Sequence, residues 1–303
     1  MSVGETVTTP VTPGSQAAAA QPEKSDRPGR MRHVLLFMLG VVTAAIFVLP
    51  LWWAVVSALR PQAETFRTLS PVSIWTVIPR DFTLSNFSKL SEGDFDLAIL
   101  NSLIVTVATL IIGLAICATA AFALAVLRFP GRTAVFAVMV ISFLIPFDAI
   151  AIPLTTIFRD AGLQNSYLAL ILPGVGNGFA VFLLRGFFLG IPEDLHEAAR
   201  LDGLGWWGIF WRIYLPLSRP ALIGAGLILF VFQWQAYLWP LLIAPDASKR
   251  VAPVAIAQFA SEHGVDFGAI FAGAVVTALI PLLVLLFFQR YFTQSLTATG
   301  VKG

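Results

Sequence analysis

The feature that most constrains this chain is a set of long apolar runs that carry almost no charge. A helix needs about 20 consecutive apolar residues to cross the hydrocarbon core of a bilayer. Six runs reach or approach that length: Val34–Ala58, Leu97–Leu127, Thr133–Phe158, Tyr167–Leu184, Pro220–Ala244 and Phe267–Gln289. They are continuous rather than alternating in polarity, which argues against a β-barrel. The sequence therefore predicts an all-α membrane protein with six transmembrane helices.

Composition supports this prediction and excludes other classes. The chain is 57% hydrophobic and only 12% charged, whereas soluble globular chains carry about 25% charged residues. A soluble enzyme is therefore excluded. The formal net charge of +2 and the lack of a basic stripe give no indication of nucleic-acid binding. The single cysteine, Cys117, lies within an apolar run and says nothing about redox compartment.

The chain divides by composition. The first segment is rich in Thr, Pro, Ala and Ser and reads as a disordered tail. The apolar run after it exceeds the core of a signal peptide and no small-residue cleavage site follows, so we expect a retained first span. The predicted parts are the tail 1–33, the first helix with an extracytoplasmic segment at 34–96, a five-helix domain at 97–290 with a long loop at 191–219, and a C-terminal tail at 291–303.

The distribution of basic residues predicts orientation. With the N-terminus inside, most of the 19 lysines and arginines fall on the cytoplasmic side, as the positive-inside rule requires. The clearest signal is the short turn between Arg128 and Arg132. Both termini and the loop 191–219 are then cytoplasmic, and the segment 60–96, with three prolines, forms an irregular outer lid with short helices at most.

The loop 191–219 has the pattern of a helical hairpin. Pro192 followed by Glu193 and Asp194 favours a helix start, because acidic groups face the positive end of the helix dipole. Gly203 predicts its end. A second short helix is expected from about Leu204 to Tyr214, broken near Pro216. Spacing alone leaves two interpretations open, an amphipathic hairpin on the membrane interface and a docking element for a cytoplasmic partner.

The order of residues in this loop resembles a known signature. Glu197-Ala198-Ala199, then Gly203, then Ile213 to Pro216 is similar to the EAA motif of ATP-binding-cassette importer permeases, in residue types and in gaps. The stretch 232–240 resembles a pattern of the carbohydrate-uptake branch, with Gln235 where asparagine is usual. The ending 296–303 resembles that of MalG-like permeases, with Thr299 where glycine is usual. The resemblance runs from about residue 34 to the C-terminus.

The resemblance implies a type I importer permease fold, with 97–290 as the permease domain in the inner membrane of a prokaryote. It implies uptake of a sugar or sugar-like solute, such as an oligosaccharide, a disaccharide or a polyol phosphate. The implied partners are a second homologous permease, two ATPase subunits, an extracytoplasmic binding protein and membrane lipid. ATP and Mg would sit on the ATPases, because this chain has no G-x-x-x-x-G-K-[ST] stretch, so we expect no bound cofactor and no enzymatic activity.

By the same resemblance, two groups of residues would contact the ATPases. The coupling residues are Glu197, Ala198, Ala199, Asp202, Gly203, Ile213, Leu215 and Pro216. The C-terminal contact residues are Gly300, Val301, Lys302 and Gly303. A zinc site is not expected, because the pair His196-Glu197 is not followed by a second histidine one helical turn later.

Asp148 is the one charged residue inside a predicted span. A charge there costs about 2.5–3.5 kcal/mol on insertion scales, so it should face water or a partner such as Arg185 or a hydroxyl group. Pro146 and Pro153 indicate a kinked segment lining a cavity. Asp148, Gln233 and Gln235 are candidates for the translocation path, although the surroundings of the glutamines favour hydrogen bonding between helices over solute contact.

Two other classes remain as alternatives. Asp148 could serve as the ion-coupling site of a secondary transporter, or the chain could be a membrane scaffold without transport activity. A secondary carrier is usually built from internal repeats, and none is evident here. Neither alternative has a use for the segment between Glu197 and Pro216.

Overall fold

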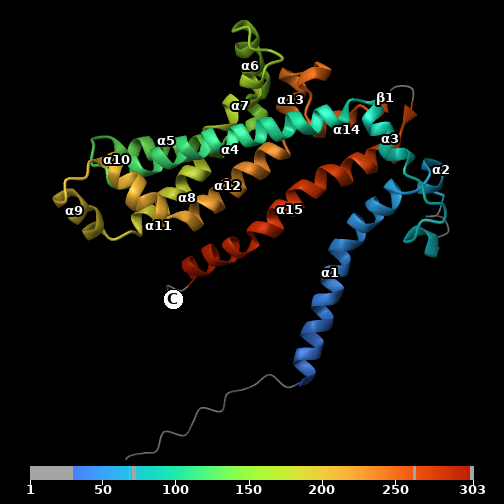
Figure 1. The fold of residues 1–303 in the computed structure, drawn as a ribbon, viewed down its shortest axis with the longest axis horizontal. Coiled ribbons are helices and arrows are strands. Elements are labelled where there is room, and N and C mark those ends of the chain that lie inside the picture. Colours follow the sequence, from blue (N-terminus) through green and yellow to red (C-terminus); the bar gives the residue numbers. More distant parts are fainter. Residues whose placement is uncertain (1–29, 68, 70–72, 262–263, 301–303) are drawn as a thin grey trace, which may run out of the picture. The chain divides into compact units, whose positions relative to one another are not determined.

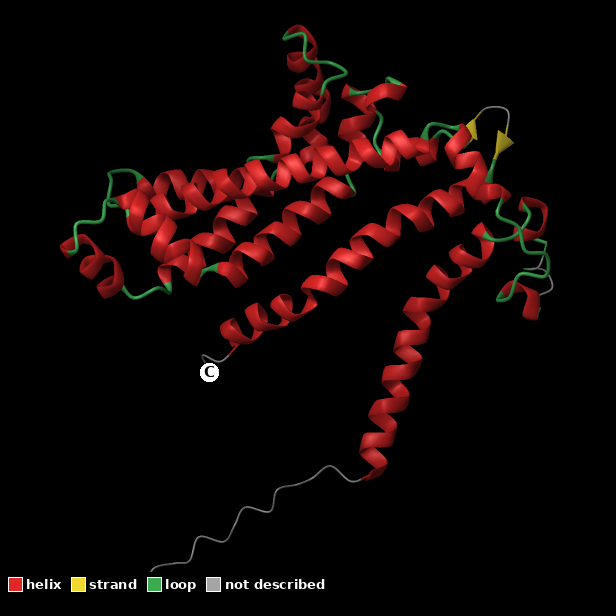
Figure 2. Cartoon of the chain, viewed as in Figure 1, coloured by secondary structure: helices red, strands yellow, loops and turns green. Residues whose placement is uncertain are grey.

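The computed structural model describes residues 30–67, 69, 73–261 and 264–300, and most of them are helical (Figures 1 and 2). The chain forms two units, Met1–Leu49 and Pro50–Gly303. The described part of the first unit belongs to helix α1 (Arg30–Ala58). Three stretches are long and apolar enough to cross a membrane, Met31–Ala58, Phe95–Val126 and Phe267–Gln289, and there are up to six if each of three bent helix pairs is one span. The predicted all-α membrane fold is confirmed.

The third predicted span is two helices rather than one. Helix α5 (Arg132–Leu144) and helix α6 (Phe147–Asp160) meet at 97°. The cause is Pro146, which has no N–H to donate and forces the residue before it out of the helical region. Ile145 is accordingly extended, with φ −75° and ψ 120°. The prediction of a kink is confirmed, and the prediction of one helix over 133–158 is wrong.

Two further predicted spans are also interrupted. Helix α7 (Tyr167–Ile171) continues as a 3-10 turn, η2 (Leu172–Gly174), before helix α8 (Gly178–Leu189), and the two parts meet at 44°. Asn177 restarts the helix, because its side-chain oxygen accepts from the Ala180 N–H at 2.9 Å. The run 220–244 contains helix α12 (Arg219–Trp234) and helix α13 (Leu238–Ile243), separated by three residues.

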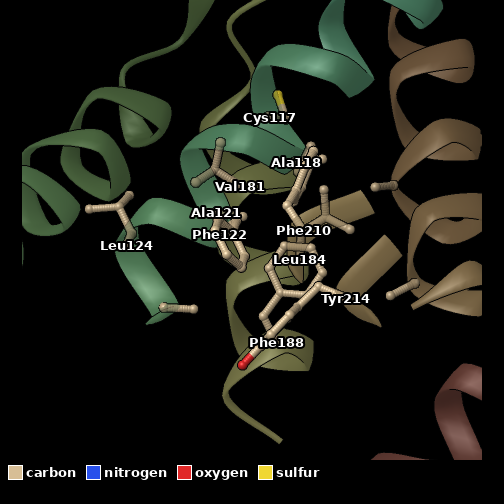
Figure 3. Packing of buried hydrophobic residues seen from close by; sticks show 14 of the residues in the cluster. Cys117, Ala118, Ala121, Phe122, Leu124, Val181, Leu184, Phe188, Phe210 and Tyr214 are labelled. Atoms are coloured by element: carbon tan, nitrogen blue, oxygen red, sulfur yellow. The ribbon is translucent and has the colours of Figure 1, made fainter. Parts of the chain in front are cut away.

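The core of the second unit lies along the unbroken helix α4 (Phe95–Val126), which packs against α8 and α12 (Figure 1). Small residues of α4, including Cys117, Ala118 and Ala121, are at most 2% exposed, and they allow close approach of the neighbouring helices. Large rings fill one end of this cluster, where Phe122 contacts Phe188 (Figure 3).

The segment expected to form the outer lid contains short elements. They are α2 (Gln62–Thr65), the 3-10 turn η1 (Ile74–Thr76) and α3 (Ser85–Glu92). The later loop adds the 3-10 turn η4 (Ala247–Lys249), α14 (Ala252–Ala257) and a two-stranded antiparallel pair, β1 (Ala260–Ser261) with β2 (Gly264–Val265). Helix α15 (Phe267–Gly300) then ends the described chain.

An ion pair connects α3 to the start of α15. Lys89 Nζ donates to Asp266 Oδ2 at 2.6 Å, and the Ala269 N–H donates to Asp266 Oδ1 at 3.0 Å. Burial alone would raise the pKa of Asp266, but these hydrogen bonds and the charge of Lys89 outweigh it, so the pKa is lowered. The carboxylate therefore also caps α15.

Candidate functional site

The first arm of the predicted hairpin is helix α9 (Glu193–Leu201). Pro192 precedes it, and Glu193 and Asp194 lie in its first turn, as predicted. It ends at Gly203, whose φ is +82°. The Gly203 N–H donates to the Arg200 carbonyl at 3.0 Å and the Leu204 N–H to the Ala199 carbonyl at 2.9 Å. These two bonds form a Schellman motif, and they fix the direction in which the chain leaves α9.

The second arm returns toward the membrane helices. It consists of helix α10 (Trp206–Ile209), a π-helical turn, η3 (Phe210–Tyr214), and helix α11 (Leu215–Leu217). The predicted break near Pro216 is confirmed to within two residues: α11 ends at Leu217, and the chain bends by 82° into α12 at Ser218. Pro216 occupies an early position in α11, where a missing N–H disrupts fewer helical bonds.

The predicted coupling residues divide between two sides of the hairpin. Ala199 is 7% exposed and belongs to the main core cluster, and Ile213 and Leu215 pack against that cluster. The remaining residues of the set are exposed, namely Glu197, Ala198, Asp202, Gly203 and Pro216. One side of the hairpin is thus attached to the bundle, and the other is available to a partner.

The free side also presents large apolar side chains. Leu201, at the end of α9, is 91% exposed, and Trp207 and Trp211 are each more than 60% exposed. Burying a leucine side chain contributes about 1.5–3 kcal/mol. An apolar tip beside the acidic residues of α9 is therefore suited to insertion into a recess of another protein.

Sequence reasoning missed the side chains that join the two arms. His196 was considered only as a zinc ligand, yet its Nδ1 lies 3.2 Å from the hydroxyl of the buried Tyr214. Arg128, in the turn before α5, approaches Glu193 at 3.6 Å, with both side chains mostly exposed. The residue types alone gave no signal for either pair, because both are tertiary contacts.

The candidate translocation residues are not brought together. Asp148 is exposed in the first turn of α6, and Gln235 is exposed where α12 ends. Gln233 is half-buried and packs tightly on η2, where a Cβ added to Gly174 would collide with its Oε1. Among the described residues, no hydrogen bond or ion pair joins Asp148 to either glutamine.

Arg185, the suggested partner of Asp148, is engaged elsewhere. Its Nε donates to the Leu124 carbonyl at 3.1 Å, and its guanidinium lies 4.1 Å from the centre of the Phe136 ring. Of the predicted C-terminal contact residues, Gly300 ends α15, and Val301, Lys302 and Gly303 lie outside the described residues.

Comparison with known proteins bears directly on this hairpin. Residues 113–298, which include it, match the family model of the binding-protein-dependent transport system inner membrane component. The chain is 33% identical over 264 residues to the arabinooligosaccharides transport system permease protein AraQ of Halalkalibacterium halodurans, covering 86% of this chain and 93% of AraQ. It is 31% identical to the sn-glycerol-3-phosphate transport system permease protein UgpE of Yersinia pestis, covering 87% and 94%.

A solved structure shares the fold. A chain of a bacterial ABC transporter involved in the import of the acidic polysaccharide alginate aligns with a TM-score of 0.75 at 21% identity, covering 90% of this chain and 100% of that one. The match extends over nearly all the described elements and confirms the predicted type I importer permease fold. This chain belongs to the binding-protein-dependent transport system inner membrane component family, and it is a multi-pass inner membrane permease of an ABC importer rather than an enzyme.

Proposed function

We propose that this chain, as a permease subunit, carries a sugar, an oligosaccharide or a polyol phosphate into the cytoplasm, driven by ATP hydrolysis on separate subunits. The substrate class rests on relatives named for arabinooligosaccharides and sn-glycerol 3-phosphate. The single observation that carries the coupling role is the hairpin, whose matched sequence and free apolar tip suit docking.

In this proposal α9 seats in a cleft of an ATPase subunit. Leu201 fills an apolar recess, and Glu197 accepts hydrogen bonds from basic or backbone groups of the ATPase. Ala198, being small, permits close approach of the partner backbone. The Schellman motif at Gly203 holds α9 at a fixed angle to α10, so displacement of the ATPase is delivered to the bundle.

The remaining partners follow from the same proposal. A second homologous permease completes the pathway, two ATPase subunits bind ATP and Mg, and an extracytoplasmic binding protein delivers the solute. Both termini are cytoplasmic, and the ending Gly300–Gly303 reaches the ATPases. Residues 34–96 carry the first span and the outer segment, and 97–290 the permease domain. Asp148, Gln233 and Gln235 are proposed to line the path.

Reconstitution of the whole complex tests this proposal. Proteoliposomes that contain both permeases, the ATPases and the binding protein should accumulate solute only with ATP on the ATPase side. Glu197→Gln should reduce uptake at least tenfold, because the exposed carboxylate loses its charge at the docking surface. Asp194→Asn is the matched control, since it removes a negative charge from the same helix outside the coupling set.

Two results would contradict the proposal. Uptake that persists without ATP and collapses when the proton gradient is dissipated, and that Asp148→Asn abolishes, would identify a secondary transporter. Equal uptake by the Glu197→Gln and wild-type complexes would remove the coupling role of α9.

A further inference from the structure

The hairpin contains one polar contact between its arms that the docking surface does not use. His196, on the inner side of α9, is half-buried, and Tyr214, at the end of η3, is 2% exposed. The His196 Nδ1 and the Tyr214 hydroxyl oxygen are 3.2 Å apart, a hydrogen-bond distance. The histidine ring also lies 6.2 Å from the ring of Trp206, measured between centroids.

Tyr214 is held rigidly by two membrane helices. Its ring meets Phe122 of α4 at a centroid distance of 5.0 Å and Phe188 of α8 at 5.6 Å, both edge to face. Figure 3 shows the three rings together at one end of the cluster. Since Phe122 and Phe188 are at most 5% exposed, any force on the tyrosine hydroxyl acts on α4 and α8.

The π-helical turn η3 explains how Tyr214 reaches this position. A π turn adds a residue to the helical repeat and changes the direction of the side chains that follow. Trp211, in the same turn, is 63% exposed, whereas Tyr214 points into the bundle. The second arm can therefore present tryptophans outward and still anchor itself inward.

The other connections of α9 differ in kind. The chain enters α9 after Gly190, and the Schellman motif at Gly203 fixes the angle at which it leaves toward α10. The Arg128–Glu193 pair is 3.6 Å long, with side chains that are 86% and 69% exposed, and such pairs contribute little. The His196–Tyr214 contact adds a sheltered polar attachment of α9 to the apolar packing at Ala199.

We propose that the His196–Tyr214 hydrogen bond is a positioning link that transmits displacement of α9 to α4 and α8. The link rests on the proposed coupling function. Without it, the inner side of α9 is held by apolar packing at Ala199 alone, and part of the motion of α9 is absorbed at its entry after Gly190, so that ATP is hydrolysed without solute import. Both residues are positioning residues, since neither is proposed to touch solute or nucleotide.

The test measures solute imported per ATP hydrolysed by the complete reconstituted complex. Tyr214→Phe keeps the ring and removes the hydroxyl, and His196→Ala removes its partner. Each should lower the ratio about fivefold, the equilibrium factor of one net hydrogen bond, and the double variant should be no worse than either single variant. His196→Asn, which restores a polar group near the position of Nδ1, should recover most of the ratio.

Tyr167→Phe is the control for losing a tyrosine hydroxyl elsewhere in the protein, because it removes a 2.7 Å hydrogen bond to Asn101 away from the hairpin. Its ratio of solute imported to ATP hydrolysed should stay at the wild-type value. A wild-type ratio in Tyr214→Phe, additive losses in the double variant, or a loss explained by less assembled complex would overturn the link. If the wild-type complex itself shows no ATP-driven uptake, the proposed function fails first.

Discussion

The turn at Gly203 gives the sharpest prediction about the hairpin formed by α9 and α10. Its φ of +82° lies in the left-handed region, and a Cβ added there meets no atom within 4 Å. Gly203→Ala therefore introduces no clash, and its whole effect is conformational. An L-residue in this region costs about 1–2 kcal/mol, offset by about 0.4–1 kcal/mol from the restricted unfolded chain. The net loss is about 1 kcal/mol, or about fivefold in the equilibrium constant between the native turn and its alternatives.

Gly205 provides a matched control two residues away. Its φ is −76° and a Cβ there also meets nothing within 4 Å, so Gly205→Ala should leave the turn intact. Gly203→Asn should be milder than Gly203→Ala, because asparagine tolerates the left-handed region better than alanine.

The assay is binding of the purified ATPase subunit to the permease pair in detergent. Gly203→Ala should weaken the apparent affinity by up to about fivefold, since the apparent dissociation constant rises as the competent fraction falls. Equal affinities for Gly203→Ala and Gly205→Ala would refute the argument that the geometry of this turn positions α9.

Two further predictions concern stability. Gly178→Ala would place a Cβ 2.7 Å from the Met139 carbonyl oxygen, and overpacking of this kind costs about 1–3 kcal/mol, so the melting temperature of this variant in detergent should fall. Gly176→Ala is the control, because a Cβ there meets nothing within 4 Å, and it should melt like wild type. Equal melting temperatures of the two variants would contradict the α5–α8 contact. Asp266 has a lowered pKa, so its contribution is present above the unfolded value near 3.9 and is lost as pH falls through the folded value. Asp266→Asn should lower the melting temperature only slightly at pH 7, because Lys89 is 42% exposed and such pairs contribute at most about 1 kcal/mol. The difference from wild type should shrink below pH 4. A difference that does not change with pH would contradict the role of the Asp266 carboxylate.

Local signals in the sequence predicted the uninterrupted parts of the fold. Runs of apolar residues located the continuous stretches of α1, α4 and α15, because crossing hydrocarbon requires length and the absence of charge. Pro192 with its acidic neighbours and Gly203 located both ends of α9, because helix ends depend on a few adjacent residues.

The interruptions and the tertiary contacts were harder to predict. The apolar run continues across Pro146, so the proline indicated a kink but not a 97° turn between two helices. The apolar run 220–244 is continuous in composition, so composition did not predict that α12 and α13 are separate helices. The contact between His196 and Tyr214 depends on a π turn and on rings from α4 and α8, none of which leaves a periodic pattern.

The most direct measurement of the central claim is whether the tip of α9 touches an ATPase. Leu201 is 91% exposed, so Leu201→Cys carrying a photoreactive maleimide should be accommodated, with the buried Cys117 replaced by alanine to prevent a second label. Illumination of the assembled complex in inside-out vesicles should attach this position to the ATP-hydrolysing subunit. Labelling of position 201 only from the extracytoplasmic side, or cross-links to lipid alone, would contradict the account.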